Sequence, residues 1–225
     1  MCGISGFNWG DSQLIEKMNK AIKHRGPDDE GVYIDDYVSL GHVRLAIIDL
    51  SSAGRQPMSN EDESIWIIYN GEVYNFLELR KDLEEKGHRF KSNTDTEVVL
   101  HAYEEWGYNC VERFNGMWAF AIYDKNKNAL FLSRDRFGIK PLYYYWDGDK
   151  FIFSSEIKGI LQHDIDRIPN DKIIYEYLAL GLLDHSRETF FKDIYRVMPG
   201  ENLIYDLSKK TLKTFKWYDL KSRIR

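Results

Sequence analysis

A series of short, aromatic-rich apolar segments separated by turn residues constrains the fold of this chain most strongly. Four such segments follow one another at residues 117–123, 129–134, 142–146 and 150–154. The polar stretches 125–128 and 147–149 lie between neighbouring segments. Short strands joined by tight turns pair in the antiparallel sense. The pattern therefore predicts antiparallel β-sheet at the centre of the molecule.

Further strands and paired helices surround this block. Apolar residues recur at helical spacing, or helix start and stop signals occur, at 11–24, 75–87, 94–107, 156–162 and 170–180. Extended segments are predicted at 2–9, at 30–50 with a break near Asp35-Asp36, at 64–69, and in a last hairpin around Pro199-Gly200. The dipeptide Asn70-Gly71 predicts a turn after the strand at 64–69. Pairs of helices between blocks of strands predict one α+β domain, with sheets packed on each other and helices outside.

Composition narrows the class of protein. The 225 residues are 43% hydrophobic and 15% aromatic, so the chain can bury a core and is not disordered. A net charge of -5 argues against nucleic acid as the main partner. No apolar run is long enough to cross a membrane, and the first residues lack the pattern of a signal peptide. Two cysteines without a pairing signature favour the reducing cytoplasm.

Cys2 is the first candidate for chemistry. A cysteine near a chain end is more often a small buried apolar residue. Removal of Met1, expected before a small residue, would however leave a thiol and a free α-amine on one residue. In model compounds the amine titrates near ~8 and the thiol near ~8.5, so the amine can act as the base for its own side chain.

Asn70 and Gly71 are the second candidate. A turn explains Asn-Gly by itself. Alternatively, the Asn70 amide and the Gly71 N–H could point at one developing negative charge and form an oxyanion hole.

Arg44 interrupts an otherwise apolar strand in the segment 42–49. A structural salt bridge and a carboxylate ligand are both compatible with a buried guanidinium. Asp95 stands at the start of a helix, where a lone acid commonly serves the helix dipole. Together an arginine and an aspartate could bind the two ends of a free α-amino acid.

Two charged loops complete the set of candidates. In residues 134–143, charges alternate tightly between two apolar strands, which predicts a buried ionic network that braces the loop. Residues 24–28 have a similar composition, and a helix stop followed by a turn explains them from pattern alone.

Eight segments in order resemble one known family. They are CGISGF at 2–7, HRGPD at 24–28, GHVRLAIIDL at 41–50, YNGEVYN at 69–75, SNTDTEVVLHAYEEWG at 92–107, FNGMWAFAIYD at 114–124, SRDRFGIKPLYY at 133–144 and FSSEIKGIL at 153–161. Each is weak alone, but the ordered set is specific and covers nearly the whole chain. The chain resembles the glutaminase domain of class II glutamine amidotransferases, which are N-terminal nucleophile hydrolases, and most closely the glutamine-hydrolysing asparagine synthetase type.

The resemblance implies a four-layer αββα sandwich, with two antiparallel sheets between helical layers. It also implies roles for individual residues. Cys2 is the expected nucleophile with its α-amine as base, and Asn70 with Gly71 the expected oxyanion hole. Arg44 is expected to bind the α-carboxylate of L-glutamine, with Glu72 and Asp95 on the α-ammonium side.

The implied reaction is hydrolysis of L-glutamine to glutamate and ammonia, with no metal or cofactor. Residues 1–218 would form the amidotransferase domain, and 219–225 would begin a linker to an ATP-dependent synthetase domain that is absent here. ATP and magnesium are expected only in that domain, which belongs either to the same polypeptide or to a separate chain. A homodimer is an oligomeric state that we consider.

Two readings stay open beside this one. The domain could serve a different acceptor, because the acceptor is set by the absent part. It could also be a non-enzymatic regulatory or docking domain that keeps the fold.

Overall fold

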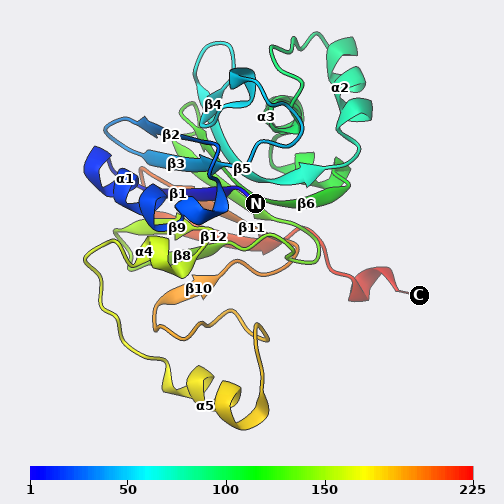
Figure 1. Ribbon diagram of the computed structural model, residues 1–225. Helices are drawn as coiled ribbons and strands as arrows, with labels where there is room; N and C mark the ends of the chain where they lie inside the picture. Colours follow the sequence, from blue (N-terminus) through cyan, green and yellow to red (C-terminus); the bar gives the residue numbers. More distant parts are fainter. Residues whose placement is uncertain (225) are drawn as a thin grey trace.

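Two six-stranded antiparallel sheets form the centre of the computed structural model, which describes residues 1–224 (Figure 1). Residue 225, the last of the predicted linker, lies outside the described residues. The first sheet has the order β10-β8-β9-β1-β3-β2. Its strands are β1 (Gly3–Phe7), β2 (Asp29–Ile34), β3 (Ser39–Arg44), β8 (Tyr143–Trp146), β9 (Phe151–Ser154) and β10 (Ile194–Arg196). The second sheet, in the order β12-β11-β7-β6-β5-β4, has the strands β4 (Met58–Ser59), β5 (Ile65–Val73), β6 (Gly116–Asp124), β7 (Ala129–Arg134), β11 (Glu201–Asp206) and β12 (Thr211–Lys216).

The apolar pattern of β6 shows why the sheets stack. Along this strand, Ala119, Ala121 and Tyr123 enter the core between the two sheets. The alternate residues Trp118 and Phe120 enter a second core on the outer face of the sheet. A strand buried on both faces must be covered by another layer on each side. One layer is the other sheet, and the second is helical.

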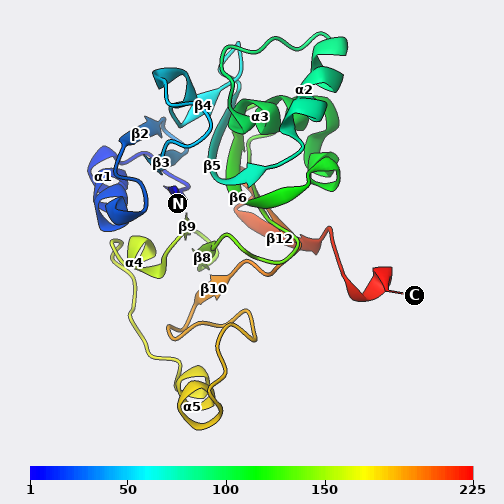
Figure 2. The same cartoon turned by 45° about the vertical axis from the view of Figure 1, so that its right-hand side comes forward.

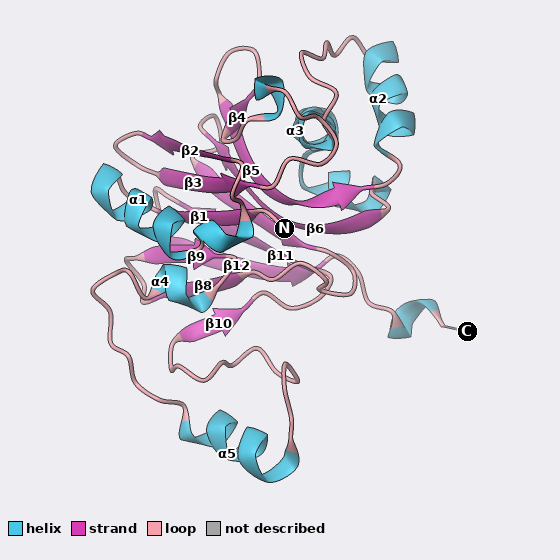
Figure 3. Cartoon of the chain, in the orientation of Figure 1, coloured by secondary structure: helices cyan, strands magenta, loops and turns pink. Residues whose placement is uncertain are grey.

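Helices supply the two outer layers (Figure 3). They are α1 (Ser12–Ala21), α2 (Phe76–Glu85), α3 (Asp95–Trp106), α4 (Ile157–Ile160) and α5 (Asp171–Leu180). Helices α1 and α4 cover the first sheet, and α2 and α3 cover the second. The helix start predicted at residue 94 is correct, because the Thr94 side chain caps α3 by accepting from the Glu97 N–H at 3.2 Å. The four-layer sandwich predicted from the sequence is confirmed.

The predicted turn at Asn70-Gly71 is wrong. Strand β5 continues through both residues to Val73, and Asn70 and Gly71 pair with Ala119 and Trp118 of β6. A Cβ at Gly71 would lie 2.6 Å from the Met117 carbonyl oxygen and from the Tyr69 ring. The glycine therefore permits close packing inside the sheet instead of a change of direction.

The last hairpin is also displaced from its predicted position. Strands β11 and β12 pair with each other across the turn 207–210. Pro199-Gly200 instead carries the chain from β10 in one sheet to β11 in the other.

One part of the molecule stands away from the sandwich. Helix α5 and its two long connections extend from the first sheet, as the views in Figures 1 and 2 both show. Within residues 1–224, no helix is both long enough and apolar enough to cross a membrane.

Candidate active site

All six residues predicted to form a site line one cavity of about 290 Å³. They come from the position directly before β1, the end of β3, the last residues of β5 and the first turn of α3, and they are Cys2, Arg44, Asn70, Gly71, Glu72 and Asp95. Strands β1 and β3 contact β5 across the interface between the sheets. The cavity therefore combines residues of both sheets, and the N-terminal residue Met1 also lines it.

Cys2 is held at the cavity wall through its backbone and its sulfur. Its carbonyl oxygen accepts from Arg25 Nε at 2.9 Å. The Leu45 N–H donates to Sγ at 3.4 Å, and the thiol is 3.5 Å from the Leu45 carbonyl oxygen. Burial raises the pKa of the Cys2 thiol, whereas the Leu45 N–H and the nearby positive charges, those of Arg44 and Lys140 among them, oppose this rise.

Arg25 is a residue of the HRGPD segment that pattern alone assigned to a turn. It also pairs with Glu156 at 2.9 Å. Burial of Glu156 opposes ionisation, but hydrogen bonds from Arg25, Lys158 and His24 prevail and lower the pKa of this carboxyl to about 2. Arg25 is therefore anchored at one end and can fix the backbone of Cys2 at the other.

The end of β5 presents an open strand edge to the cavity. Strand β4 pairs with β5 only at Trp66 and Ile67, so among residues 1–224 no strand neighbours the edge beyond them. The Tyr69 N–H donates to Gln56 Oε1 at 2.7 Å, and the Val73 N–H donates to Asp95 Oδ2 at 3.0 Å. Because alternate N–H groups of a strand point to the same edge, the N–H of Gly71 also points to this open edge.

Asn70 supplies a second donor. The residue is 1% exposed, and within residues 1–224 its Nδ2 atom has no hydrogen-bond acceptor. A buried amide without a partner costs free energy of about 1–3 kcal/mol unless a ligand completes it. Asn70 Nδ2 and the Gly71 N–H can therefore serve one anionic oxygen in the cavity.

Arg44 ends β3 and is 7% exposed. Its guanidinium donates to the carbonyl oxygen of Ser51 at 2.8 Å and to that of Asp49. A Cβ at Gly54 would lie 2.2 Å from Nη2, so the glycine leaves room for this group. No carboxylate of residues 1–224 forms an ion pair with Arg44, and the salt-bridge alternative is wrong. A positive charge satisfied only by neutral carbonyls can attract a carboxylate ligand.

Asp95 is the first residue of α3, so it lies at the positive end of the helix dipole, as the sequence predicts. Its Oδ2 accepts from the Tyr69 hydroxyl at 2.7 Å and from the Val73 N–H. Burial raises the pKa of Asp95 despite these hydrogen bonds. Glu72, half-buried on β5, brings a second carboxyl to the same cavity.

The charged loop 134–143 contributes Lys140, which sequence reasoning did not assign to the site. Lys140 is 7% exposed and lines the cavity, and burial lowers the pKa of its ammonium. The prediction of an ionic network is wrong for Arg134 and Asp135, whose side chains form hydrogen bonds with backbone groups instead. Arg134 donates to the carbonyl oxygens of Gly138, Lys140 and Val197.

Asp135 completes this arrangement from the other side. Its carboxylate accepts from the backbone N–H groups of Phe137, Ile139 and Lys140 at 3.0 Å each. Side chain to backbone bonds therefore brace the loop and position Lys140.

Comparison with known proteins identifies the family. A family model described as a glutamine amidotransferase domain matches residues 1–218. The chain belongs to the glutamine amidotransferase domain family. The resemblance inferred from the eight segments is confirmed.

Curated relatives of this amidotransferase domain are longer proteins. A Methanocaldococcus jannaschii protein, provisionally named asparagine synthetase (glutamine-hydrolysing) 2, is 46% identical over 98% of this chain and 47% of its own length. Asparagine synthetase (glutamine-hydrolysing) 3 of Bacillus subtilis is 40% identical over 99% of this chain and 37% of its own length. The chain thus spans less than half of either relative.

A solved structure shares the fold. The glutamine phosphoribosylpyrophosphate amidotransferase of B. subtilis superposes with a TM-score of 0.70, at 20% identity, over 96% of this chain and 49% of that one. At 20% sequence identity, this similarity shows that the two proteins share the fold and shows nothing further.

Proposed function

We propose that this domain hydrolyses L-glutamine to glutamate and ammonia, with Cys2 as the nucleophile. The observation that carries the proposal is the Cys2 thiol in one cavity with Asn70 and Gly71. Within residues 1–224 the Asn70 Nδ2 donor has no acceptor, and the Gly71 N–H points to the open edge of β5. A thiolate next to preorganised donors is suited to acyl transfer, because the donors stabilise the oxyanion of the tetrahedral intermediate.

The reaction proceeds through a thioester. The Cys2 sulfur attacks the side-chain amide carbon of glutamine, and the carbonyl oxygen gains negative charge beside Asn70 and Gly71. The α-amine of Cys2 takes the proton of the thiol during this attack and delivers it to the nitrogen of the departing ammonia. Water then cleaves the γ-glutamyl thioester, which releases glutamate and restores the thiol.

This mechanism requires removal of Met1. In the described chain the nitrogen of Cys2 belongs to the Met1–Cys2 peptide bond, so it is not an amine. Arg25 binds the carbonyl on the other side of Cys2 and leaves that nitrogen untouched. Removal of Met1 would therefore free the amine without loosening the anchor of residue 2.

The two ends of the substrate find opposite charges in the cavity. Arg44 would bind the α-carboxylate of glutamine, and Glu72 with Asp95 would bind its α-ammonium group. Amide cleavage by these groups needs no metal or cofactor.

We further propose that the ammonia passes to an ATP-dependent synthetase part of asparagine synthetase type, with aspartate as acceptor. ATP and magnesium would be bound there. The supporting observations are the two longer relatives and the exposed apolar residues of the α5 region. The large apolar side chains there that are more than half exposed are Tyr175, Leu178, Leu180 and Leu183. Such a patch marks an interaction surface.

Ammonia release from glutamine tests the proposal directly. Protein from which Met1 has been removed, as verified by intact mass, is expected to release ammonia, and Cys2→Ala is expected to release none. Inactivity of correctly processed, folded protein, both alone and with a synthetase partner, would favour a docking domain. Transfer to an acceptor other than aspartate would keep the glutaminase proposal and replace the partner.

A further inference from the structure

A second cluster of reactive side chains lies on α3, away from the Cys2 cavity. His88, His101 and Glu104 each offer one potential ligand atom, and these atoms lie within 4.8 Å of one another. His101 and Glu104 are three residues apart on α3 and therefore share a face of the helix. His88 follows α2 and reaches the same place from the connection between the two helices.

Both imidazole rings direct the same nitrogen toward one carboxylate. Nδ1 of His101 lies 2.5 Å from Glu104 Oε2, and Nδ1 of His88 lies 3.8 Å from the same oxygen. The ring centroids of the two histidines are 5.0 Å apart. The other carboxylate oxygen, Oε1, accepts from Asn60 Nδ2 at 2.8 Å, which fixes the orientation of the Glu104 group.

The opposite ring nitrogens also meet carboxylates. Nε2 of His88 lies 3.5 Å from Glu105, and Nε2 of His101 lies 3.9 Å from both Glu61 and Glu97. Metal-bound histidines characteristically direct their second nitrogen to a carboxylate, which sets the tautomer and strengthens the ligand. Here the distance of 3.5 Å at His88 is at the limit of a hydrogen bond, and the two carboxylates at His101 lie just beyond that limit.

We propose that His88, His101 and Glu104 bind one Zn²⁺ ion. Two imidazoles and one carboxylate form a set that zinc prefers, with bonds of about 2.0–2.2 Å. Tetrahedral geometry would place the ligand atoms about 3.3 Å apart, so Glu104 must move slightly away from His101 and His88 must move toward it. His88 and Glu104 also line a surface hollow together with Glu61, Lys86 and Gly87, and water from this hollow would supply the fourth ligand.

The ion would join the α2–α3 connection to α3. Glu97 of α3 already accepts from the N–H groups of Lys91 and Ser92 at 2.7 Å each. The same connection leads directly to Thr94 and Asp95 at the start of α3. Zinc would therefore act as a structural clamp on the segment that positions Asp95, with no part in the chemistry at Cys2.

Titration of the untagged protein with Co²⁺ and Zn²⁺ tests the site. We expect one Co²⁺ per chain with visible d–d absorption and no thiolate charge-transfer band, because all three ligands are nitrogen or oxygen. A thiolate band would assign the metal to a cysteine and overturn the proposal. Displacement by Zn²⁺ and a zinc-dependent rise of the melting temperature are expected as well.

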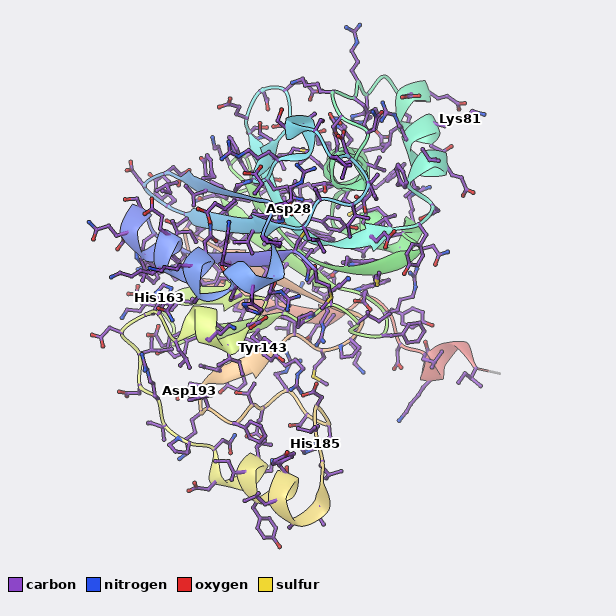
Figure 4. The ribbon with its side chains drawn as sticks, in the orientation of Figure 1. Asp28, Lys81, Tyr143, His163, His185 and Asp193 are labelled. Carbon is purple, nitrogen blue, oxygen red and sulfur yellow. The ribbon has the colours of Figure 1, made fainter. Side chains whose placement is uncertain are left out.

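Two mild substitutions and one control sharpen the test. His88→Ala changes a partly exposed residue outside the helices, and Glu104→Gln keeps the size of the side chain and the contact with Asn60. Each is expected to weaken Zn²⁺ binding by about 100-fold or more, since loss of an outer partner alone costs about 10–100-fold. His185→Ala removes another imidazole paired with a carboxylate, near α5 at the end of the molecule opposite α2 (Figure 4). It should bind zinc like the unchanged protein. Absence of saturable binding, or equal affinity in all variants with native circular dichroism, would overturn the zinc site.

Discussion

The two cysteines of this protein lie in contrasting surroundings. Cys2 lines a cavity between the sheets, with a backbone N–H at its sulfur and the charges of Arg44 and Lys140 nearby. Cys110, in the turn of 3-10 helix Gly107–Arg113, is fully buried in the core beneath α2 and α3. Burial raises the pKa of both thiols. Space for a substrate and unsatisfied donors, more than the direction of the pKa shift, therefore distinguish a candidate nucleophile from a core residue.

Alkylation should show the largest difference between the two sites. We expect iodoacetamide to modify Cys2 faster than Cys110 by on the order of 10³-fold or more in the native protein, because Cys110 reacts only after opening of the core. Peptide mass spectrometry over time gives both rates. Comparable rates in folded protein would remove the contrast, and denaturant should equalise them.

Asn70→Ala tests the proposed oxyanion donor in the Cys2 cavity. Loss of one such donor typically lowers kcat by about 10²–10³-fold, and KM for glutamine should change little. Asn202→Ala is the matched control, because Asn202 is also a buried asparagine whose amide lacks partners, and it is not among the residues lining the cavity. An equal loss of kcat in both variants would indicate general damage to the sheet.

Arg44→Lys should separate charge from shape in the same cavity. The ammonium keeps the charge but cannot form two parallel bonds to a carboxylate, so KM for glutamine should rise by about 10- to 100-fold. The exposed Arg55, changed to lysine, should leave KM unaltered. If Arg44→Lys lowered the melting temperature and left KM unchanged, Arg44 would be a support for the Asp49–Ser51 loop alone.

Cys110→Ser should affect stability and leave the reaction intact. A hydroxyl in place of the buried thiol loses apolar contacts and needs a hydrogen-bond partner, which costs about 1–3 kcal/mol of unfolding free energy. Denaturant titration measures this cost, and kcat at a temperature where the variant is folded should equal that of the unchanged protein. A selective loss of kcat would contradict a purely structural role for Cys110.

Lys140→Met should give the smallest effect, visible in the pH dependence of Cys2. The positive charge of Lys140 lowers the pKa of the Cys2 thiol, so its removal raises that pKa and leaves less thiolate at neutral pH. Alkylation of Cys2 at pH 7 should slow by about 2- to 5-fold, and its pH midpoint should move upward. The exposed Lys150, changed to methionine, should leave the midpoint in place.

Much of this arrangement could be predicted from local pattern. The aromatic-rich apolar segments of β6 and β7 and the helix start and stop signals at 94 and 107 each act over a few neighbours, and the bounds predicted from them are close to those of the structure. The fold class required the ordered motifs together. The gathering of six site residues from four elements followed from the family resemblance.

The errors arose where a partner distant in sequence decides the structure. Asn70-Gly71 has the local preference of a turn, but pairing with all of β6 keeps it in a strand. The salt-bridge alternative for Arg44 and the ionic network predicted for the loop 134–143 both failed, because Arg44 and Arg134 donate to backbone carbonyls that only the folded chain brings to them. Lys140 has no signal in its spacing, because its burial beside Cys2 depends on the fold of the loop 134–143.

The proposed nucleophile Cys2 directly precedes β1 of the first sheet, whereas the proposed oxyanion donors Asn70 and Gly71 lie in β5 of the second, and this division has a consequence for evolution. The hydrophobic core between the two sheets includes Ala119, Ala121 and Leu132. The size of its side chains sets the distance between Cys2 and the two donors. Replacing a small side chain there by a larger one would change the rate of the proposed reaction without altering any group that contacts the substrate. Substitutions in the core can therefore adjust the proposed activity during evolution.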